Sequence, residues 1–114
     1  DFNCIPRDED CWDPRAWAED ALAYPTTRER FRKLQWMGYT DAFMARDGRI
    51  QKYTFWDYQA GAWQKDWGIR IDHLMCSPQA ADRLKSIGIH RAARGTDALG
   101  KPSDHVPVIA TFAD

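Results

Sequence analysis

A chain of 114 residues has room for one domain, and its formal net charge of −1 argues against a simple basic surface that holds nucleic acid by counterion release. The same charge leaves open a site in which carboxylates bind a cation. The three cysteines, Cys4, Cys11 and Cys76, form no CxxC pair, so we expect free thiols rather than a disulfide framework or a zinc site. We find no signal peptide and no apolar run long enough to span a bilayer, which predicts a cytoplasmic protein without a membrane partner.

The charges are unevenly distributed along the chain. Acidic residues dominate the first twenty positions, whereas basic residues outnumber their acidic neighbours in the later part. The later basic residues are Arg83, Lys85, Arg91, Arg94 and Lys101. A solvated surface and a track for phosphate groups are both compatible with this pattern.

The N-terminal segment predicts an exposed strand end and a short helix. Residues 1–5 resemble the end of a strand, which Pro6 stops. Asp13 and Pro14 then predict a helix over residues 14–22, because Asp is a favoured N-cap and Pro is favoured at the first helical position.

The clearest helix follows this segment. Thr26 or Thr27 is the expected N-cap, Phe31 and Leu34 recur at helical spacing, and Gly38 ends the pattern. An amphipathic helix of this kind is typical of a layer that packs on a sheet.

The second half of the sequence predicts a strand-rich layer. We expect strands over residues 53–58, 69–76, 87–90 and 106–112, with a helical turn at 79–84, and a basic, glycine-containing loop before the last strand. Two or three helices beside four or five strands indicate an α/β or α+β fold.

Polar residues next to these strands could carry out phosphodiester hydrolysis. They are Asp1, Asn3, Asp72, Asp104 and His105. Carboxylates can hold a cation and move protons, an amide can donate to a phosphate oxygen, and an imidazole can contact a phosphate or be oriented by a carboxylate.

Four motifs together resemble, in order and spacing, the closing motifs of the exonuclease III family of abasic-site endonucleases, within the endonuclease/exonuclease/phosphatase superfamily. The motifs are DFN at 1–3, YTFWDY at 53–58, GIRIDHLM at 68–75 and KPSDHVPV at 101–108. The resemblance implies that residues 1–114 form the C-terminal part of one domain whose N-terminal half is absent. The implied fold is half of a four-layered α-β-β-α sandwich, with mainly one mixed β-sheet and outer helices.

The resemblance also implies roles for the polar residues. Asp1 matches the aspartate thought to handle the proton of the attacking water or the leaving oxygen, and Asn3 matches the asparagine that donates to the phosphate and can touch the metal. Asp104 resembles the metal-ligand aspartate. His105 resembles the histidine that contacts the scissile phosphate, and Asp72 the carboxylate that pairs with this histidine and fixes its tautomer. The implied catalytic set is Asp1, Asn3, Asp72 and His105, and the implied metal set is Asp1, Asn3, Asp104 and His105.

Four apolar residues correspond to the family's pocket for the base-less sugar. They are Phe55, Trp56, Ile69 and Ile71, of which Phe55 and Ile71 are the stronger candidates, while ordinary core packing is the alternative for Trp56 and Ile69. Arg70 and His73 flank Asp72 and are expected to be structural.

The activity implied by the resemblance is metal-dependent cleavage of double-stranded DNA on the 5′ side of abasic sites, with 3′-to-5′ exonuclease activity. The implied cofactor is Mg²⁺, with Mn²⁺ as a substitute, and the implied full-length protein is a monomer located inside the cell with DNA. Because the family's principal metal-anchoring glutamate lies in the N-terminal half, residues 1–114 alone are expected to be inactive. The alternatives are a related phosphoesterase acting on inositol phosphates, sphingolipids or RNA, and a catalytically silent DNA-binding module.

Overall fold

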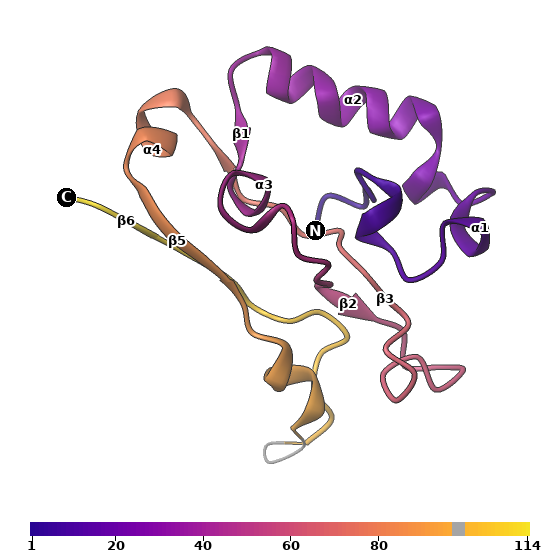
Figure 1. The fold of residues 1–114 in the computed structure, drawn as a ribbon. Helices are drawn as coiled ribbons and strands as arrows, with labels where there is room; N and C mark the ends of the chain where they lie inside the picture. Colours follow the sequence, from indigo (N-terminus) through magenta and orange to yellow (C-terminus); the bar gives the residue numbers. More distant parts are fainter. Residues whose placement is uncertain (97–99) are drawn as a thin grey trace.

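The computed structural model describes residues 1–96 and 100–114 and shows short helices and strands joined by long connections (Figure 1). The helices are α1 (Pro14–Trp17), α2 (Pro25–Trp36), α3 (Ala42–Asp47) and α4 (Pro78–Asp82), with 3₁₀ turns at Asp8–Asp10, Ala21–Ala23 and Arg91–Gly95. The strands are β1 (Thr40–Asp41), β2 (Phe55–Trp56), β3 (Gly68–Ile69), β4 (Met75–Cys76), β5 (Leu84–Ile89) and β6 (Val108–Phe112). None of the helices in these two ranges is long and apolar enough to cross a membrane. The mixed α/β class is confirmed by this arrangement.

The strands pair differently from the single mixed sheet that was expected. Within the described residues they form three antiparallel pairs, β1 with β4, β2 with β3, and β5 with β6. Single bridges from Cys11 to Ile69 and from Phe55 to His105 extend the central pair on both sides. The centre of the fold is therefore a narrow antiparallel layer, and it places His105 beside β2.

The predicted strand over residues 69–76 is interrupted in its middle. The hydroxyl oxygen of Thr54 accepts hydrogen bonds from the backbone amides of Ile71 at 3.1 Å and Asp72 at 3.2 Å. Because one side-chain oxygen binds two consecutive amides, those amides do not enter a regular strand ladder. The strand ends after β3 and resumes only at β4.

The helix α2 begins earlier than its sequence predicted. Its N-cap is Tyr24 and its first residue is Pro25, so the expected caps Thr26 and Thr27 lie inside the first turn. Proline at the first position fixes the helical φ and favours an extended residue before it, which explains this start. The hydroxyl of Thr27 instead donates to the backbone oxygen of Ala21 at 2.6 Å.

Other boundaries agree more closely with the predictions. Asp13 caps α1 by accepting from the amide of Arg15, although the helix is short and the 3₁₀ turn Ala21–Ala23 replaces its second half. Gly38, at a φ of 106°, follows the end of α2 as expected. The last two predicted strands correspond to β5 and β6, and residues 97–99 of the expected loop between them lie outside the described residues. The short β1 and α3 were not predicted.

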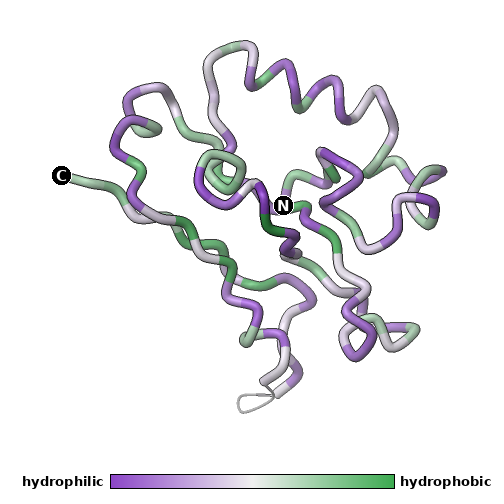
Figure 2. The backbone as a smooth tube through the Cα atoms, viewed as in Figure 1, coloured by the Kyte–Doolittle hydropathy of each residue, from purple (hydrophilic) through white to green (hydrophobic). Residues whose placement is uncertain are grey.

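Three apolar clusters stabilise the fold in the part of the chain that the structure describes. The first joins α3 to β4 and β5 through Phe43, Cys76 and Ile87. The other two lie on the two sides of the central layer, one around Ile5, Cys11, Ile69 and Ile71, and one around Tyr53, Trp56 and Val106. Hydrophobic residues also follow both strands of the long β5–β6 hairpin (Figure 2). The three cysteines are buried free thiols.

Candidate active site

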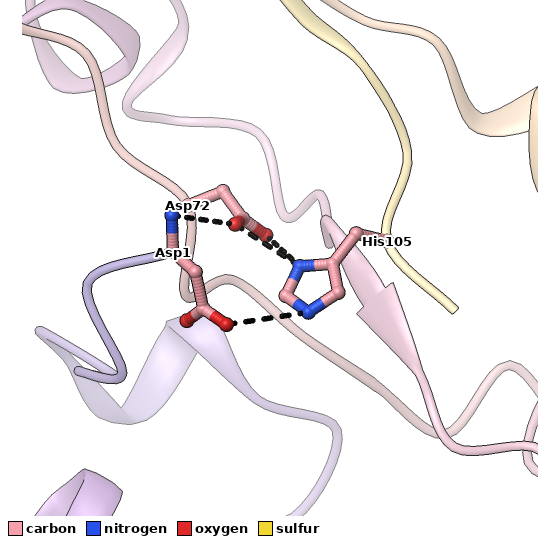
Figure 3. Close-up of side chains that lie close together, drawn as sticks. All are labelled: Asp1, Asp72 and His105. Atoms are coloured by element: carbon pink, nitrogen blue, oxygen red, sulfur yellow. Dashed lines mark hydrogen bonds and ion pairs between the residues drawn. The ribbon is translucent and has the colours of Figure 1, made fainter. Parts of the chain in front are cut away.

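The centre of the candidate site is a contact between His105 and Asp72 (Figure 3). His105 Nδ1 lies 2.8 Å from Asp72 Oδ2 and 3.0 Å from Asp72 Oδ1, although 33 positions separate the two residues. A carboxylate only accepts hydrogen bonds, so Nδ1 of the imidazole carries a proton and donates it to Asp72, and Nε2 faces away from Asp72. The contact that the motifs predicted is therefore present.

Backbone hydrogen bonds place His105 at this position. The amide of Trp56 donates to the backbone oxygen of Asp104 at 3.0 Å, and the amide of Val106 donates to the backbone oxygen of Thr54 at 2.9 Å. The ring of Phe55 meets the imidazole nearly edge-on, with centroids 5.1 Å apart. These contacts hold the SDH segment along β2, so the imidazole has one well-defined position.

Asp1 completes a cluster of three polar side chains. His105 Nε2 lies 3.5 Å from Asp1 Oδ2, and the backbone nitrogen of Asp1 lies 3.3 Å from Asp72 Oδ1. Figure 3 shows the imidazole between the two carboxylates. In the described part of the chain, these are the only three acidic, His or Cys side chains whose possible ligand atoms lie within 4.8 Å of one another.

The carboxylate of Asp72 is held in its charged form. Burial by itself would raise its pKa, but hydrogen bonding from Thr54 and His105 outweighs burial and lowers the pKa below its ordinary value. Asp72 therefore remains an anion near neutral pH and can orient the imidazole.

The other two polar residues of the motifs lie outside this cluster. Asn3 is exposed, and its backbone amide donates to Asp1 Oδ1 at 3.1 Å. Asp104 is half-buried, and among the described residues its carboxylate makes no hydrogen bond or ion pair. The structure thus brings Asp1, Asp72 and His105 together, and the predicted metal ligands Asn3 and Asp104 lie outside this cluster.

The residues present do not form a complete Mg²⁺ site. Mg²⁺ requires six oxygen ligands in near-octahedral geometry, whereas the cluster offers two carboxylates whose oxygens already face the imidazole nitrogens. Asp104 could add one more carboxylate oxygen. Residues 1–114 could therefore supply only part of the ligand set for such an ion.

The four predicted substrate-binding residues are placed in different environments. Phe55 is half-buried beside His105, where it could contact a ligand. Trp56, Ile69 and Ile71 are only 1 to 3% exposed and pack in the two clusters of the central layer. In this structure these three side chains are core residues, and a contact between them and substrate stays a prediction.

A buried ionic network around Arg70 lies next to Asp72, and no pattern in the sequence predicted its partners. Arg70 is fully buried, and its guanidinium donates to Asp10 Oδ1 at 2.8 Å and to Asp41 Oδ2 at 3.0 Å. Burial raises the pKa of Asp10, but the hydrogen bonds from Arg7 and Arg70 outweigh this and hold the pKa below its ordinary value. The expectation of a structural role for Arg70 agrees with this burial.

His73 belongs to the same network. Its Nδ1 atom lies 3.1 Å from a guanidinium nitrogen of Arg70, and its Nε2 atom lies 2.9 Å from the backbone oxygen of Cys4. Burial, followed by the positive charge of Arg70, lowers the pKa of His73, so the ring is neutral near pH 7.

Several of the later basic residues lie over aromatic rings. Arg91 lies 4.1 Å from the ring centroid of Trp63, and Lys101 lies 3.7 Å from that of Tyr58. Arg94 is buried and bonded to the backbone oxygen of Trp56. These contacts give Arg91, Arg94 and Lys101 a packing role, and a role of the later basic residues in tracking phosphate stays a prediction.

Comparison with known proteins places this geometry in a family. The profile of the Endonuclease/Exonuclease/phosphatase family matches residues 1–105. Exodeoxyribonuclease III of Haemophilus influenzae is 33% identical over 89 residues, which cover 77% of this chain and 32% of that protein. DNA repair nuclease APEX1 of Danio rerio is 30% identical over 114 residues, which cover 99% of this chain and 34% of that protein.

Solved structures show the same fold. The 3′-5′ exonuclease NExo from Neisseria meningitidis has a TM-score of 0.90 and 38% identity, with 98% of this chain and 43% of that chain covered. An AP endonuclease from Archaeoglobus fulgidus has a TM-score of 0.88 and 27% identity, with 96% and 42% covered. The chain spans about a third of the length of the two sequence relatives above. The chain belongs to the Endonuclease/Exonuclease/phosphatase family, and it is similar to the exonuclease III and AP endonuclease members of this family.

Proposed function

We propose that residues 1–114 are the C-terminal part of a DNA repair nuclease of exonuclease III type. The proposed reactions are hydrolysis of the phosphodiester on the 5′ side of abasic sites and removal of nucleotides from 3′ ends. The observation that carries the proposal is the imidazole of His105 held between Asp72 and Asp1. The names of the relatives, which include DNA repair nucleases and exonucleases, support DNA as the substrate.

The proposed roles follow from the geometry of the three residues. Asp72 accepts a hydrogen bond from His105 Nδ1, so Nε2 is the atom that meets the substrate phosphate, and it donates to a phosphate oxygen when it also carries a proton. The 3.5 Å separation between Nε2 and Asp1 Oδ2 is longer than a strong hydrogen bond. A phosphate oxygen or a water molecule could therefore replace Asp1 Oδ2 as the partner of Nε2. Asp1 is then positioned to orient the attacking water or to receive its proton.

A divalent cation completes the proposed chemistry. Mg²⁺ or Mn²⁺ would neutralise charge on the phosphate, with Asp104, Asp1, Asn3 and His105 as the ligand candidates of this chain. Because these residues supply only part of an octahedral set, we expect residues 1–114 alone to cleave no DNA. We also propose that the full-length protein is an intracellular monomer.

A second candidate reaction is removal of a phosphate from a DNA 3′ end. It is favoured by the likeness to the 3′ phosphatase NExo from Neisseria bound to product DNA hairpin, which has a TM-score of 0.91 and 36% identity over 98% of this chain and 42% of that chain. The same oriented imidazole would contact a terminal phosphate as well as an internal one. Activity on duplexes with an internal phosphodiester and on duplexes with a terminal 3′ phosphate therefore distinguishes the nuclease reactions from the phosphatase reaction.

The test uses the intact protein that contains these residues and three duplexes, which carry an abasic site, a recessed 3′ hydroxyl end or a 3′ phosphate. Each is assayed with Mg²⁺, with Mn²⁺ and with a chelator. His105→Ala should lower the rate on the true substrate by about a hundredfold or more, because it removes a preorganised contact to the phosphate. Arg15→Ala, at an exposed position whose side chain pairs with Asp13 and not with a residue of the site, is the matched control. Equal rates for His105→Ala and the control on every duplex would rule out the proposed role of His105.

A further inference from the structure

Among the described residues, one hydrogen bond between backbone groups holds the segment that carries Asp1 and Asn3. This segment forms neither a helix nor a strand. The amide of Phe2 donates to the backbone oxygen of Ile71 at 3.0 Å, and Asn3 has a φ of 52°, a left-handed conformation that asparagine tolerates better than most residues. A short segment with this backbone needs a further anchor to hold its side chains in register.

His73 supplies such an anchor, and its contacts fix its tautomer. An arginine side chain has only hydrogen-bond donors, so the Nδ1 atom of His73, 3.1 Å from Arg70, must accept. The proton of the neutral ring then lies on Nε2, which donates to the backbone oxygen of Cys4 at 2.9 Å. Each ring nitrogen therefore has one partner and one role.

The surroundings leave the ring of His73 no other orientation. Asp10 and Asp41 hold Arg70 by paired hydrogen bonds, so the donor to Nδ1 is itself fixed. The ring centroids of Phe2 and Phe31 lie 5.6 and 4.8 Å from that of His73. Only 7% of His73 is exposed. The anchor is thus rigid, and it connects the buried ionic network to the backbone of Cys4.

We propose that His73 is a positioning residue for the candidate active site, which fixes the segment of Asp1 and Asn3 against Asp72 and His105 through the Cys4 backbone. This inference rests on the proposed function. Its basis is that His73 follows Asp72 directly in the chain, while its ring holds Cys4, the residue that follows Asn3. One residue thereby joins the two segments that contribute Asp1 and Asp72. A displacement of about 1 Å at a catalytic group can lower a rate by about a hundredfold.

The test compares two substitutions at this position in the intact protein. His73→Phe keeps an aromatic ring but removes the donor to Cys4 and the acceptor for Arg70, whereas His73→Gln keeps one donor and one acceptor. For His73→Phe we expect kcat for DNA cleavage to fall by about ten- to a hundredfold with little change in KM. Hydrogen exchange at the amide of Phe2 should become about tenfold faster or more, because the segment opens more often. For His73→Gln, both kcat and the exchange rate at the Phe2 amide should lie much closer to their wild-type values.

Ile87→Ala is the matched control for loss of stability. Ile87 is buried in the cluster between α3 and β5, so its truncation lowers Tm without touching residues 1–5. The proposal is overturned if Ile87→Ala reproduces the exchange and kcat changes, or if His73→Phe exchanges like the wild-type protein. If the wild-type protein cleaves no DNA, the proposed function fails, and the exchange rates alone then confirm or overturn the role of His73.

Discussion

Arg70 and Asp41 form a buried ion pair, with the guanidinium nitrogen 3.0 Å from Asp41 Oδ2 and less than 2% of either side chain exposed. The other oxygen of Asp41 accepts from the amides of Phe43 and Met44 and so caps α3. The same guanidinium binds Asp10, which is 60 positions away in the sequence. One buried cation thus connects the N-terminal loop, the start of α3 and the segment that carries Asp72.

Removing this cation should destabilise the fold strongly. Arg70→Met keeps most of the side-chain volume but leaves the carboxylates of Asp10 and Asp41 buried without it, which we expect to lower the free energy of unfolding by about 3 to 5 kcal/mol. Urea unfolding followed by circular dichroism measures this change. Arg15→Ala removes a fully exposed ion pair with Asp13, and its effect on the free energy of unfolding should be small, because solvent screens such a pair. If Arg70→Met lowered the free energy of unfolding no more than Arg15→Ala does, this result would contradict the structural role of the network.

The network should also make stability depend on pH in the acid range. The folded pKa of Asp10 lies below its ordinary value of 3.8, so its contribution is complete above that value and is lost as the pH falls through the folded pKa. Unfolding measured between pH 7 and pH 2.5, values chosen to span this range, should show a difference between the wild-type protein and Asp10→Asn that is greatest at neutral pH. This difference should shrink below about pH 4. A difference independent of pH would show that Asp10 carries no lowered pKa.

Asp72→Asn should separate orientation of the imidazole from stability. The amide has the same shape but can present its NH₂ group to His105, so the proton no longer has to lie on Nδ1. We expect DNA cleavage by the intact protein to fall by about a hundredfold or more while Tm changes little. The ¹⁵N shifts of the His105 ring, compared with wild type, report the tautomer directly. Cleavage at the wild-type rate with a changed tautomer would show that this orientation is not needed.

Gly68 should tolerate no side chain. A Cβ atom there would lie 2.4 to 2.6 Å from the ring and Cβ atoms of Tyr53, which is buried and cannot move freely. Gly68→Ala should therefore lower the free energy of unfolding by about 1 to 3 kcal/mol, as overpacking does in other cores. At Gly88, the nearest atoms to an added Cβ belong to the end of the His90 side chain, at 3.3 Å, so Gly88→Ala is the control and should change stability little. Equal effects in urea unfolding would contradict the close packing of β3 on Tyr53.

Local signals in the sequence determined the family and many boundaries. Proline and glycine act through backbone sterics that need no distant partner, which is why Pro14 and Gly38 marked the ends of helices correctly. The spacing of the DFN, RID and SDH motifs identified the polar residues, and the expected pairing of Asp72 with His105 is present at 2.8 Å.

Tertiary contacts decided the rest, because they depend on side chains that meet only after folding. Residues 69–76 have the composition of one strand, yet the hydroxyl of Thr54 binds the amides of Ile71 and Asp72 and breaks the ladder there. No periodicity in the sequence could pair Arg70 with Asp10 across 60 positions or turn the Nε2 atom of His73 toward Cys4. The sequence by itself determined which chemical groups this protein has, and the folded chain determined which of them meet, because hydrogen bonds between distant side chains and backbone leave no local pattern.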